Sequence, residues 1–142
     1  MIRRVEPDDL TAENWQPLGE AIQERQKWPK PLNGGYFFPE VQRLMRMGIA
    51  EAWGSIDRQT LLIALFTTNP FTGERGGMVF CWWSLGPGSN EAFDLFEWEA
   101  QRRKCAHTYV SVFGEVRSEA IERLYRRKGF VPHERILRKI YG

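Results

Sequence analysis

The sequence feature with the clearest chemistry is a glycine-rich turn between an apolar run, residues 78–85, and a helical pattern. The turn reads Gly86-Pro87-Gly88-Ser89-Asn90. Turns of this kind often hold phosphate groups, because the first N–H groups of the following helix point outward and have no partner within the helix. The same residues also suit a helix without a ligand, with Ser89 or Asn90 as its cap and Glu91 opposing the helix dipole. Both interpretations remain open at this point.

The cysteine and histidine residues form no pattern of a metal site or a nucleophile. Cys81 and Cys105 lack the spacing of a zinc site or of a disulfide framework, so we expect no metal and a reducing compartment. The flanks of Cys81 are apolar and would raise the pKa of its thiol, which disfavours a nucleophilic role. His107 and His133 are isolated in the sequence and have no evident partners.

Two predicted strands precede the turn and must position it. Residues 60–68 (TLLIALFTT) and 78–85 (MVFCWWSL) are apolar runs of strand length. The turn-forming residues 69–77 separate them, so the pair is typical of a hairpin. Trp82 and Trp83 are neighbours on the second strand and should therefore point to opposite faces of the sheet.

The first half of the chain is predicted to begin with a strand at residues 2–6, followed by two helices. Pro17 is tolerated only in a first helical turn, so the first helix should begin near Asn14. Pro39 should begin the second, short helix. Residues 49–56 are either an earlier strand or a continuation of this helix.

The second half of the chain is predicted to continue with a helix, a strand, a further helix and a closing segment. The ranges are a helix from the turn to about Lys104, a strand over 107–113, a helix over 118–128 with Gly129 as its C-cap, and an extended segment over 131–141. The whole order is β-α-α-β-β-β-α-β-α-β, with no repeat and no linker. It predicts one α/β or α+β domain that spans residues 1–142.

The end of the chain resembles the GNAT (GCN5-related N-acetyltransferase) superfamily. The residues that carry the resemblance are Leu124-Tyr125, three further residues and Gly129-Phe130, within the segment EAIERLYRRKGFVPHERILRK. The order of the predicted elements is also similar to that of the family. The resemblance implies a mixed central sheet flanked by helices, acetyl-CoA as the cofactor and an amine as the acceptor substrate.

The resemblance also implies roles for two parts of this sequence. Tyr125 matches the family's tyrosine, which can protonate the thiolate that leaves the thioester; the alternative is an inward aromatic side chain that only packs. The turn matches the loop that holds the pyrophosphate of acetyl-CoA. The cofactor-binding residues implied in this way are Leu85, Gly86, Gly88, Ser89 and Asn90.

The turn nevertheless departs from the family pattern Gln/Arg-x-x-Gly-x-Gly/Ala and is several residues shorter, so the cofactor loop is degenerate. Pro87 removes one N–H donor from it. A general base is not evident either, because the strand at residues 78–85 carries no carboxylate. Glu51 and Glu115 are the nearest candidates, and we expect each to be a surface charge.

The composition is that of a soluble globular protein. Of the 142 residues, 42% are hydrophobic and 27% are charged, and no apolar run is long enough to predict a transmembrane helix. The first residues lack the apolar core of a signal peptide, so we expect a cytoplasmic protein. Residues 102–142 hold 11 of the 20 lysines and arginines but only 4 of the 18 acidic residues. This asymmetry indicates either an anionic partner or solvated helix faces.

Two functions agree with these observations. The first is an acetyl-CoA-dependent N-acyltransferase with weak or lost activity. The second is a non-catalytic GNAT-like module for protein contacts, for example a bacteriophage virion component, located in the host cytoplasm or the virion. A protein partner or a homo-oligomer is then expected. We expect neither nucleic acid nor a membrane as a partner, because no nucleic-acid-binding motif and no membrane segment is recognisable.

Overall fold

The computed structural model describes residues 1–28, 30–111, 118–134 and 136–141. The chain forms two compact units, Met1–Ser111 and Val112–Gly142. The elements of the first unit are β1 (Ile2–Val5), a 3-10 turn η1 (Pro7–Asp9), α1 (Ala12–Gln26), α2 (Gly34–Arg46), β2 (Ala50–Ser55), β3 (Thr60–Thr68), β4 (Arg75–Ser84), α3 (Ser89–Arg102) and β5 (His107–Tyr109). The second unit contains α4 (Ser118–Arg127). The prediction of one domain over the whole chain stays a prediction.

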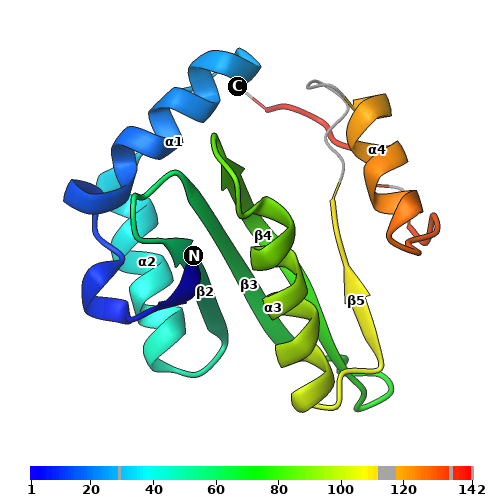
Figure 1. Ribbon diagram of the computed structural model, residues 1–142. Helices are drawn as coiled ribbons and strands as arrows, with labels where there is room; N and C mark the ends of the chain where they lie inside the picture. The colour runs from blue at the N-terminus through cyan, green and yellow to red at the C-terminus, as the bar shows by residue number, and fades with distance from the viewer. Residues whose placement is uncertain (29, 112–117, 135, 142) are drawn as a thin grey trace. The chain divides into compact units, whose positions relative to one another are not determined.

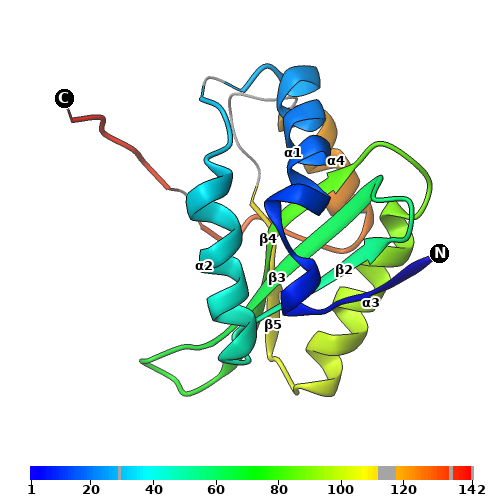
Figure 2. The same cartoon turned by 90° about the vertical axis from the view of Figure 1, so that its left-hand side faces the viewer.

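The sheet of the first unit is mixed and has the strand order β1-β2-β3-β4-β5 (Figure 1). The first three strand pairs are antiparallel, and β4 and β5 are parallel. Helices α1 and α2 cover one face of the sheet, and α3 covers the other (Figure 2). The predicted α+β class and a mixed sheet flanked by helices are therefore confirmed.

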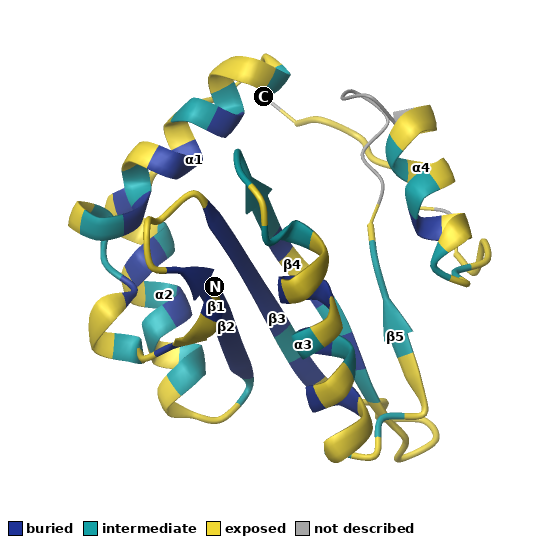
Figure 3. Cartoon of the chain, in the orientation of Figure 1, coloured by how far each residue is buried: buried dark blue, intermediate teal, exposed yellow. Residues whose placement is uncertain are grey.

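Strand β3 lies in the middle of the core. Leu61, Leu62 and Ile63 are fully buried, although neighbouring side chains of a strand point to opposite faces (Figure 3). The reason is that helices cover both faces of the sheet at this strand, so neither face requires polar residues. The continuous apolar run at residues 60–68 thus reports burial from two sides.

The two adjacent tryptophans of β4 pack against different helices, as predicted. The ring of Trp82 stacks on Phe93 of α3, with 5.1 Å between the ring centroids. The ring of Trp83 meets Phe37 of α2 edge to face, with 5.6 Å between the centroids. The pair therefore joins β4 to both helical layers.

Both helices of the first half begin earlier than predicted. Helix α1 begins at Ala12 because Thr11 caps it, with the hydroxyl accepting the N–H of Asn14. Helix α2 begins at Gly34, because the Asn33 side chain caps it in the same way. Pro17 and Pro39 consequently lie inside their helices. The expected starts at Asn14 and Pro39 were wrong because the capping side chains, and not the prolines, define these ends.

The remaining differences concern the strands. Residues 50–55 form β2, which settles the ambiguity of residues 49–56 in favour of a strand. Strand β5 ends at Tyr109, short of the predicted Phe113, and residues 112–117 lie outside the described part of the chain. The described residues of the segment 131–141 form no strand, because they have no strand partner. Gly129 ends α4 as expected, with a φ of +96°.

Replacing the fully buried Phe93 by alanine should lower the free energy of unfolding by about 3–5 kcal/mol, because a cavity would open between α3 and Trp82. Urea denaturation followed by tryptophan fluorescence measures this change. Trp98→Ala on the same helix is the matched control. Its side chain is 62% exposed, so the loss should stay below about 1 kcal/mol. Equal losses in the two variants would contradict the packing described here.

Candidate functional site

The turn from β4 to α3 is fixed by hydrogen bonds to the loop between β2 and β3. The N–H of Leu85 donates to the carbonyl oxygen of Gln59 at 2.8 Å. The hydroxyl oxygens of Thr60 and Ser84 lie 2.8 Å apart, and the Ser84 hydroxyl donates to the carbonyl oxygen of Gly86 at 3.1 Å. Thr60 is fully buried, so these bonds form away from water. They hold the turn in one conformation.

Gly88 is the residue from which α3 begins. Its φ is +103°, in the left-handed region that favours glycine, and its carbonyl oxygen accepts the N–H of Ala92 at 2.9 Å. A Cβ atom at this position would lie 2.9 Å from Cδ1 of Ile2, so a side chain there would require the end of the Ile2 side chain to shift. The backbone conformation is therefore the main reason for glycine at position 88.

The expected cap of α3 by Ser89 or Asn90 is wrong. The N-cap is Gly88, which has no side chain, and α3 has no side-chain capping hydrogen bond. Ser89 and Asn90 already belong to the helix. The N-cap residue of α3 thus supplies no side-chain cap, and a helix N-terminus that begins at a glycine can bind an anion through its backbone.

Glu91 makes a contact that the sequence does not predict. Its carboxylate accepts the backbone N–H of Ile2 at 3.2 Å. This hydrogen bond links α3 to β1 and occupies one of the two oxygens of the Glu91 carboxylate. The expectation that Glu91 opposes the helix dipole is compatible with this bond, because a carboxylate in the first turn is favourable in either case.

Strands β4 and β5 pair only at one end. Their contact runs from Gly76 to Met78 on β4, whereas β4 continues to Ser84. Among the described residues, the edge of β4 from Val79 onward has no strand beside it. The backbone N–H and C=O groups of this edge are a place where an extended ligand can pair.

A β-bulge lies at the point where the two strands part. Cys81 is opposite Ile63 and Val79 is opposite Ala64, so Phe80 is the additional residue on β4. The side chain of Phe80 is 48% exposed and meets the Phe37 ring edge to face, with 5.9 Å between the centroids. The bulge thus places a half-exposed aromatic ring beside the open edge.

Tyr125, the predicted proton donor, lies on α4 in the second unit. Its side chain is buried and meets the ring of Phe130 edge to face at 5.8 Å. Burial raises the pKa of Tyr125 to about 12, so the phenol keeps its proton at neutral pH. The structure brings Leu85, Gly86, Gly88, Ser89 and Asn90 together in one turn. That Tyr125 acts with them stays a prediction.

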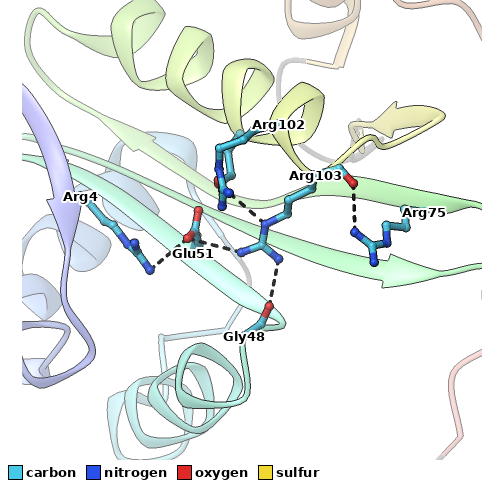
Figure 4. A network of polar contacts seen from close by, with 7 residues as sticks. Arg4, Gly48, Glu51, Arg75, Arg102 and Arg103 are labelled. Atoms are coloured by element: carbon cyan, nitrogen blue, oxygen red, sulfur yellow. Dashed lines mark hydrogen bonds and ion pairs between the residues drawn. The ribbon is translucent and has the colours of Figure 1, made fainter.

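Glu51 is not the surface charge that the sequence suggests. It is buried on β2, and its carboxylate pairs with the guanidinium groups of Arg4 at 3.0 Å and Arg103 at 3.3 Å (Figure 4). Burial raises its pKa, and the nearby charge of Glu99 raises it further, against the opposing effect of the two arginines. Glu115, the other candidate base, lies outside the described residues.

Glu99 of α3 is the second buried carboxylate of this network. Burial alone would raise its pKa, but hydrogen bonds from Arg102 and the charges of Arg102 and Arg103 hold the pKa below the ordinary value. One of these bonds, from Nη2 of Arg102, is 2.9 Å long. Glu99 is therefore ionised at neutral pH, and its negative charge pairs with the arginines at the end of α3.

The position of Glu51 disfavours it as a general base for the turn. The turn packs on Thr60, whose N–H donates to Ser55 at the far end of β2. Glu51 lies four residues earlier, about 13 Å along the strand. Sequence reasoning missed both Thr60 and the network of Glu51 and Glu99. A threonine inside an apolar run and a glutamate in a short strand were the only signals.

Two classes of feature are not found in the part of the chain that the structure describes. No group of three or more His, Cys, Asp or Glu side chains is placed to hold a metal ion. No helix there is sufficiently long and apolar to cross a membrane.

Comparison with known proteins connects this geometry to one fold. No model of a protein family and no curated protein matches the sequence. Solved structures do match. A GCN5-related N-acetyltransferase from Ralstonia eutropha is 17% identical, with a TM-score of 0.75 and coverage of 100% of this chain and 99% of that one. A ribosomal-protein-alanine N-acetyltransferase from Brucella melitensis biovar Abortus is 18% identical, with a TM-score of 0.72 and coverage of 100% and 99%.

An aminoglycoside acetyltransferase from an uncultured soil metagenomic sample is similar as well. It is 12% identical, with a TM-score of 0.71, and the match covers 100% of this chain and 95% of that one. Identities this low show a common fold and leave the activity open. The chain therefore has the GNAT fold, as the resemblance of its C-terminal segment implied.

The pair of buried carboxylates predicts a pH effect that differs between its members. The folded protein binds a proton at Glu51 more tightly than the unfolded chain does, so stability is lost as the pH rises above the ordinary value of 4.5. Glu51→Gln removes this loss. The free energy of unfolding of the Glu51→Gln variant, minus that of the unchanged protein, should therefore rise between pH 4.5 and 7.5. Urea titrations at a series of pH values will measure this difference.

Glu99→Gln is the matched control for this experiment. The lowered pKa of Glu99 gives a stability contribution that is present above pH 4.5 and is lost only at lower pH. This variant should lose about 1–3 kcal/mol near pH 4.5, because the hydrogen bonds from Arg102 are gone. Its relative stability should rise with pH less than that of Glu51→Gln, because the buried Glu51 carboxyl is retained and only one cause of its raised pKa is removed. A pH-independent difference for Glu51→Gln would show that burial does not control its protonation.

Proposed function

We propose that the protein is an acetyl-CoA-dependent N-acyltransferase. The observation that carries the proposal is the parting of β4 from β5 at the bulge of Phe80, next to a helix N-terminus without a side-chain cap. An open strand edge can pair with an extended amide-containing chain, and the helix N-terminus attracts phosphate. Both features fit one elongated cofactor. Acetyltransferases among the similar folds support the choice.

The residues of the turn fit the cofactor better than the sequence pattern indicates. The N–H groups at Gly88, Ser89 and Asn90 stand at the positive end of α3, where the pyrophosphate would bind. Gly86 and Gly88 add no side chain that would obstruct the approach of the pyrophosphate. Leu85 is the residue that follows β4. The engagement of the Glu91 carboxylate by Ile2 reduces its conflict with a phosphate. Acetyl-CoA supplies an acyl thioester when bound.

Tyr125 is proposed to hold the proton that the leaving thiolate requires. A phenol whose pKa is about 12 is fully protonated at neutral pH, and it can donate to a thiolate or orient the sulfur by a hydrogen bond. The residues of β4 include no carboxylate, so this strand offers no general base. We therefore expect the acceptor amine to lose its proton to water before or during its attack on the thioester.

The proposal includes a cellular compartment and an acceptor substrate. Both cysteines are free thiols, in agreement with a reducing environment, and we propose a cytoplasmic location. The acceptor is a primary amine. The Brucella melitensis neighbour is named for the alanine of a ribosomal protein, so a peptide N-terminus belongs in the panel of amines that is tested.

The binding of acetyl-CoA is tested by Ser89→Asp. A carboxylate in the first turn of α3 would stabilise the helix by about 0.3–1 kcal/mol, so folding is preserved, while it would repel a pyrophosphate at the same N–H groups. Isothermal titration should show a dissociation constant for acetyl-CoA that is about tenfold higher or more. Gln101→Glu, the same charge change at the other end of α3, should bind normally. No binding by the unchanged protein at millimolar acetyl-CoA would end the proposal.

The role of Tyr125 is tested by Tyr125→Phe. Loss of the phenolic proton should lower kcat about 100-fold while the KM for acetyl-CoA stays within about twofold, because the ring is retained. The release of free CoA thiol with each amine of the panel measures both constants. Tyr36→Phe, at an exposed tyrosine of α2, is the control and should keep full activity. Unchanged kcat in Tyr125→Phe would leave this residue a packing role only.

A second candidate function is a non-catalytic module that binds another protein, for example in a bacteriophage virion. One observation favours it. The apolar side chains of the C-terminal segment, Val131, Ile136, Leu137, Ile140 and Tyr141, are 77–84% exposed. Light scattering coupled to size-exclusion chromatography distinguishes the two functions. A monomer that turns over acetyl-CoA supports the enzyme, and a concentration-dependent oligomer that does not bind acetyl-CoA supports the module.

A further inference from the structure

A depression of about 410 Å³ lies where α3 ends, beside the hairpin of β3 and β4. Its walls hold three arginines, Arg75, Arg102 and Arg103. The hydroxyl residues Thr67 and Thr68 line the same surface, and Phe66 and Cys105 complete it. None of the described lining residues is acidic. A concave surface with several cations and no carboxylate attracts anions.

The arginines are held in place from behind. Arg103 pairs with Glu51 at 3.3 Å and donates to the carbonyl oxygen of Gly48 at 3.0 Å (Figure 4). Its guanidinium also lies 4.1 Å from the centroid of the Phe66 ring. Its side chain is only 20% exposed. Arg103 is therefore a fixed part of the wall, and the carboxylate that pairs with it stands outside the lining of the depression.

Arg102 and Arg75 are the more accessible cations. Arg102 is bound to Glu99, yet its side chain is 58% exposed, so part of the guanidinium faces water. Arg75 donates to the carbonyl oxygen of Arg103 at 3.2 Å, which orients its guanidinium beside Arg103 (Figure 4). Among the described residues no carboxylate forms an ion pair with Arg75. Most of its five N–H donors therefore remain for a ligand.

The charges of the network do not cancel. Arg4, Arg75, Arg102 and Arg103 stand against the two carboxylates of Glu51 and Glu99 (Figure 4). The thiol of Cys105 adds no negative charge, because burial raises its pKa and it stays protonated at neutral pH. Three of the four arginines, Arg75, Arg102 and Arg103, line the depression, whereas neither carboxylate does.

We propose that this depression is a binding site for a small phosphorylated ligand. Two guanidinium groups can meet the oxygens of a phosphate by paired hydrogen bonds, and the threonine hydroxyls can meet a third oxygen. The volume lies within the range of small-molecule sites and exceeds that of inorganic phosphate alone. The ligand is therefore expected to carry a further group besides the phosphate.

This site is separate from the proposed cofactor turn. Helix α3 begins after Gly88 and has 14 residues, so its two ends lie about 21 Å apart. The turn is at the first end and Arg102 is at the last residue of the helix. A phosphate bound at Arg75 and Arg102 is consequently a second ligand, and the inference does not depend on acetyl-CoA binding.

Arg75→Gln tests the site without disturbing the buried pairs of Glu51 and Glu99. Isothermal titration at constant ionic strength should show binding of inorganic phosphate and tighter binding of a sugar phosphate to the unchanged protein. Arg75→Gln should weaken both about tenfold or more, as expected for the loss of hydrogen bonds between charged groups. Arg25→Gln, at an exposed arginine of α1, is the matched control and should bind normally.

The labelling of Cys105 by iodoacetamide locates the ligand. Because Cys81 is buried, Cys105 is the cysteine that should react, and mass spectrometry can follow its slow labelling. A bound sugar phosphate should slow this labelling at least threefold. Arg75→Gln should abolish this protection. The proposal is overturned if phosphate does not bind at tens of millimolar, or if both variants lose affinity equally. Binding of an oligonucleotide without binding of a sugar phosphate would also overturn it, since the ligand would then be a nucleic acid.

Discussion

Burial of β3 from both sides is the constraint on which the rest of the structure depends. Because α1 and α2 cover one face of the sheet and α3 the other, Leu61, Leu62 and Ile63 are all removed from water. Any polar group that shares this interior then needs a partner within the protein. Thr60 finds Ser84, and Glu51 finds Arg4 and Arg103.

These obligatory partners also arrange the two ends of α3. At the first end, the bond between Thr60 and Ser84 fixes the turn, so the helix begins at a glycine and keeps its first N–H groups without a side-chain cap. At the last end, Glu99 holds Arg102 and lies near Arg103, which leaves positive charge at the surface. The two proposed anion sites thus lie at the two ends of one helix and differ in physical origin: backbone dipoles at one end and arginine side chains at the other.

The turn between β4 and α3 departs from the GNAT cofactor-loop pattern, whereas the fold agrees with the GNAT fold. The family pattern would supply glycines and a glutamine or arginine before them, and this chain has only the glycines. The structure compensates in part, because Gly88 caps without a side chain and Glu91 is engaged by Ile2. The edge of β4 that has no strand beside it among the described residues does not depend on the loop, since it follows from the pairing of β5 with Gly76–Met78 alone. These observations agree with the acyltransferase that we propose.

The sequence by itself determined the element order from β3 to α4, the hairpin of β3 and β4 and the opposite directions of Trp82 and Trp83, because these follow from local apolar patterns and the alternation of a strand. It did not determine where α1 and α2 begin, since Thr11 and Asn33 compete with Pro17 and Pro39 for that role. The burial of Glu51, the cap of α3 and the gathering of Arg75 and Arg103 were decided only by the tertiary structure. Each depends on residues far apart in the chain, and no local pattern records which partner a charged side chain will meet.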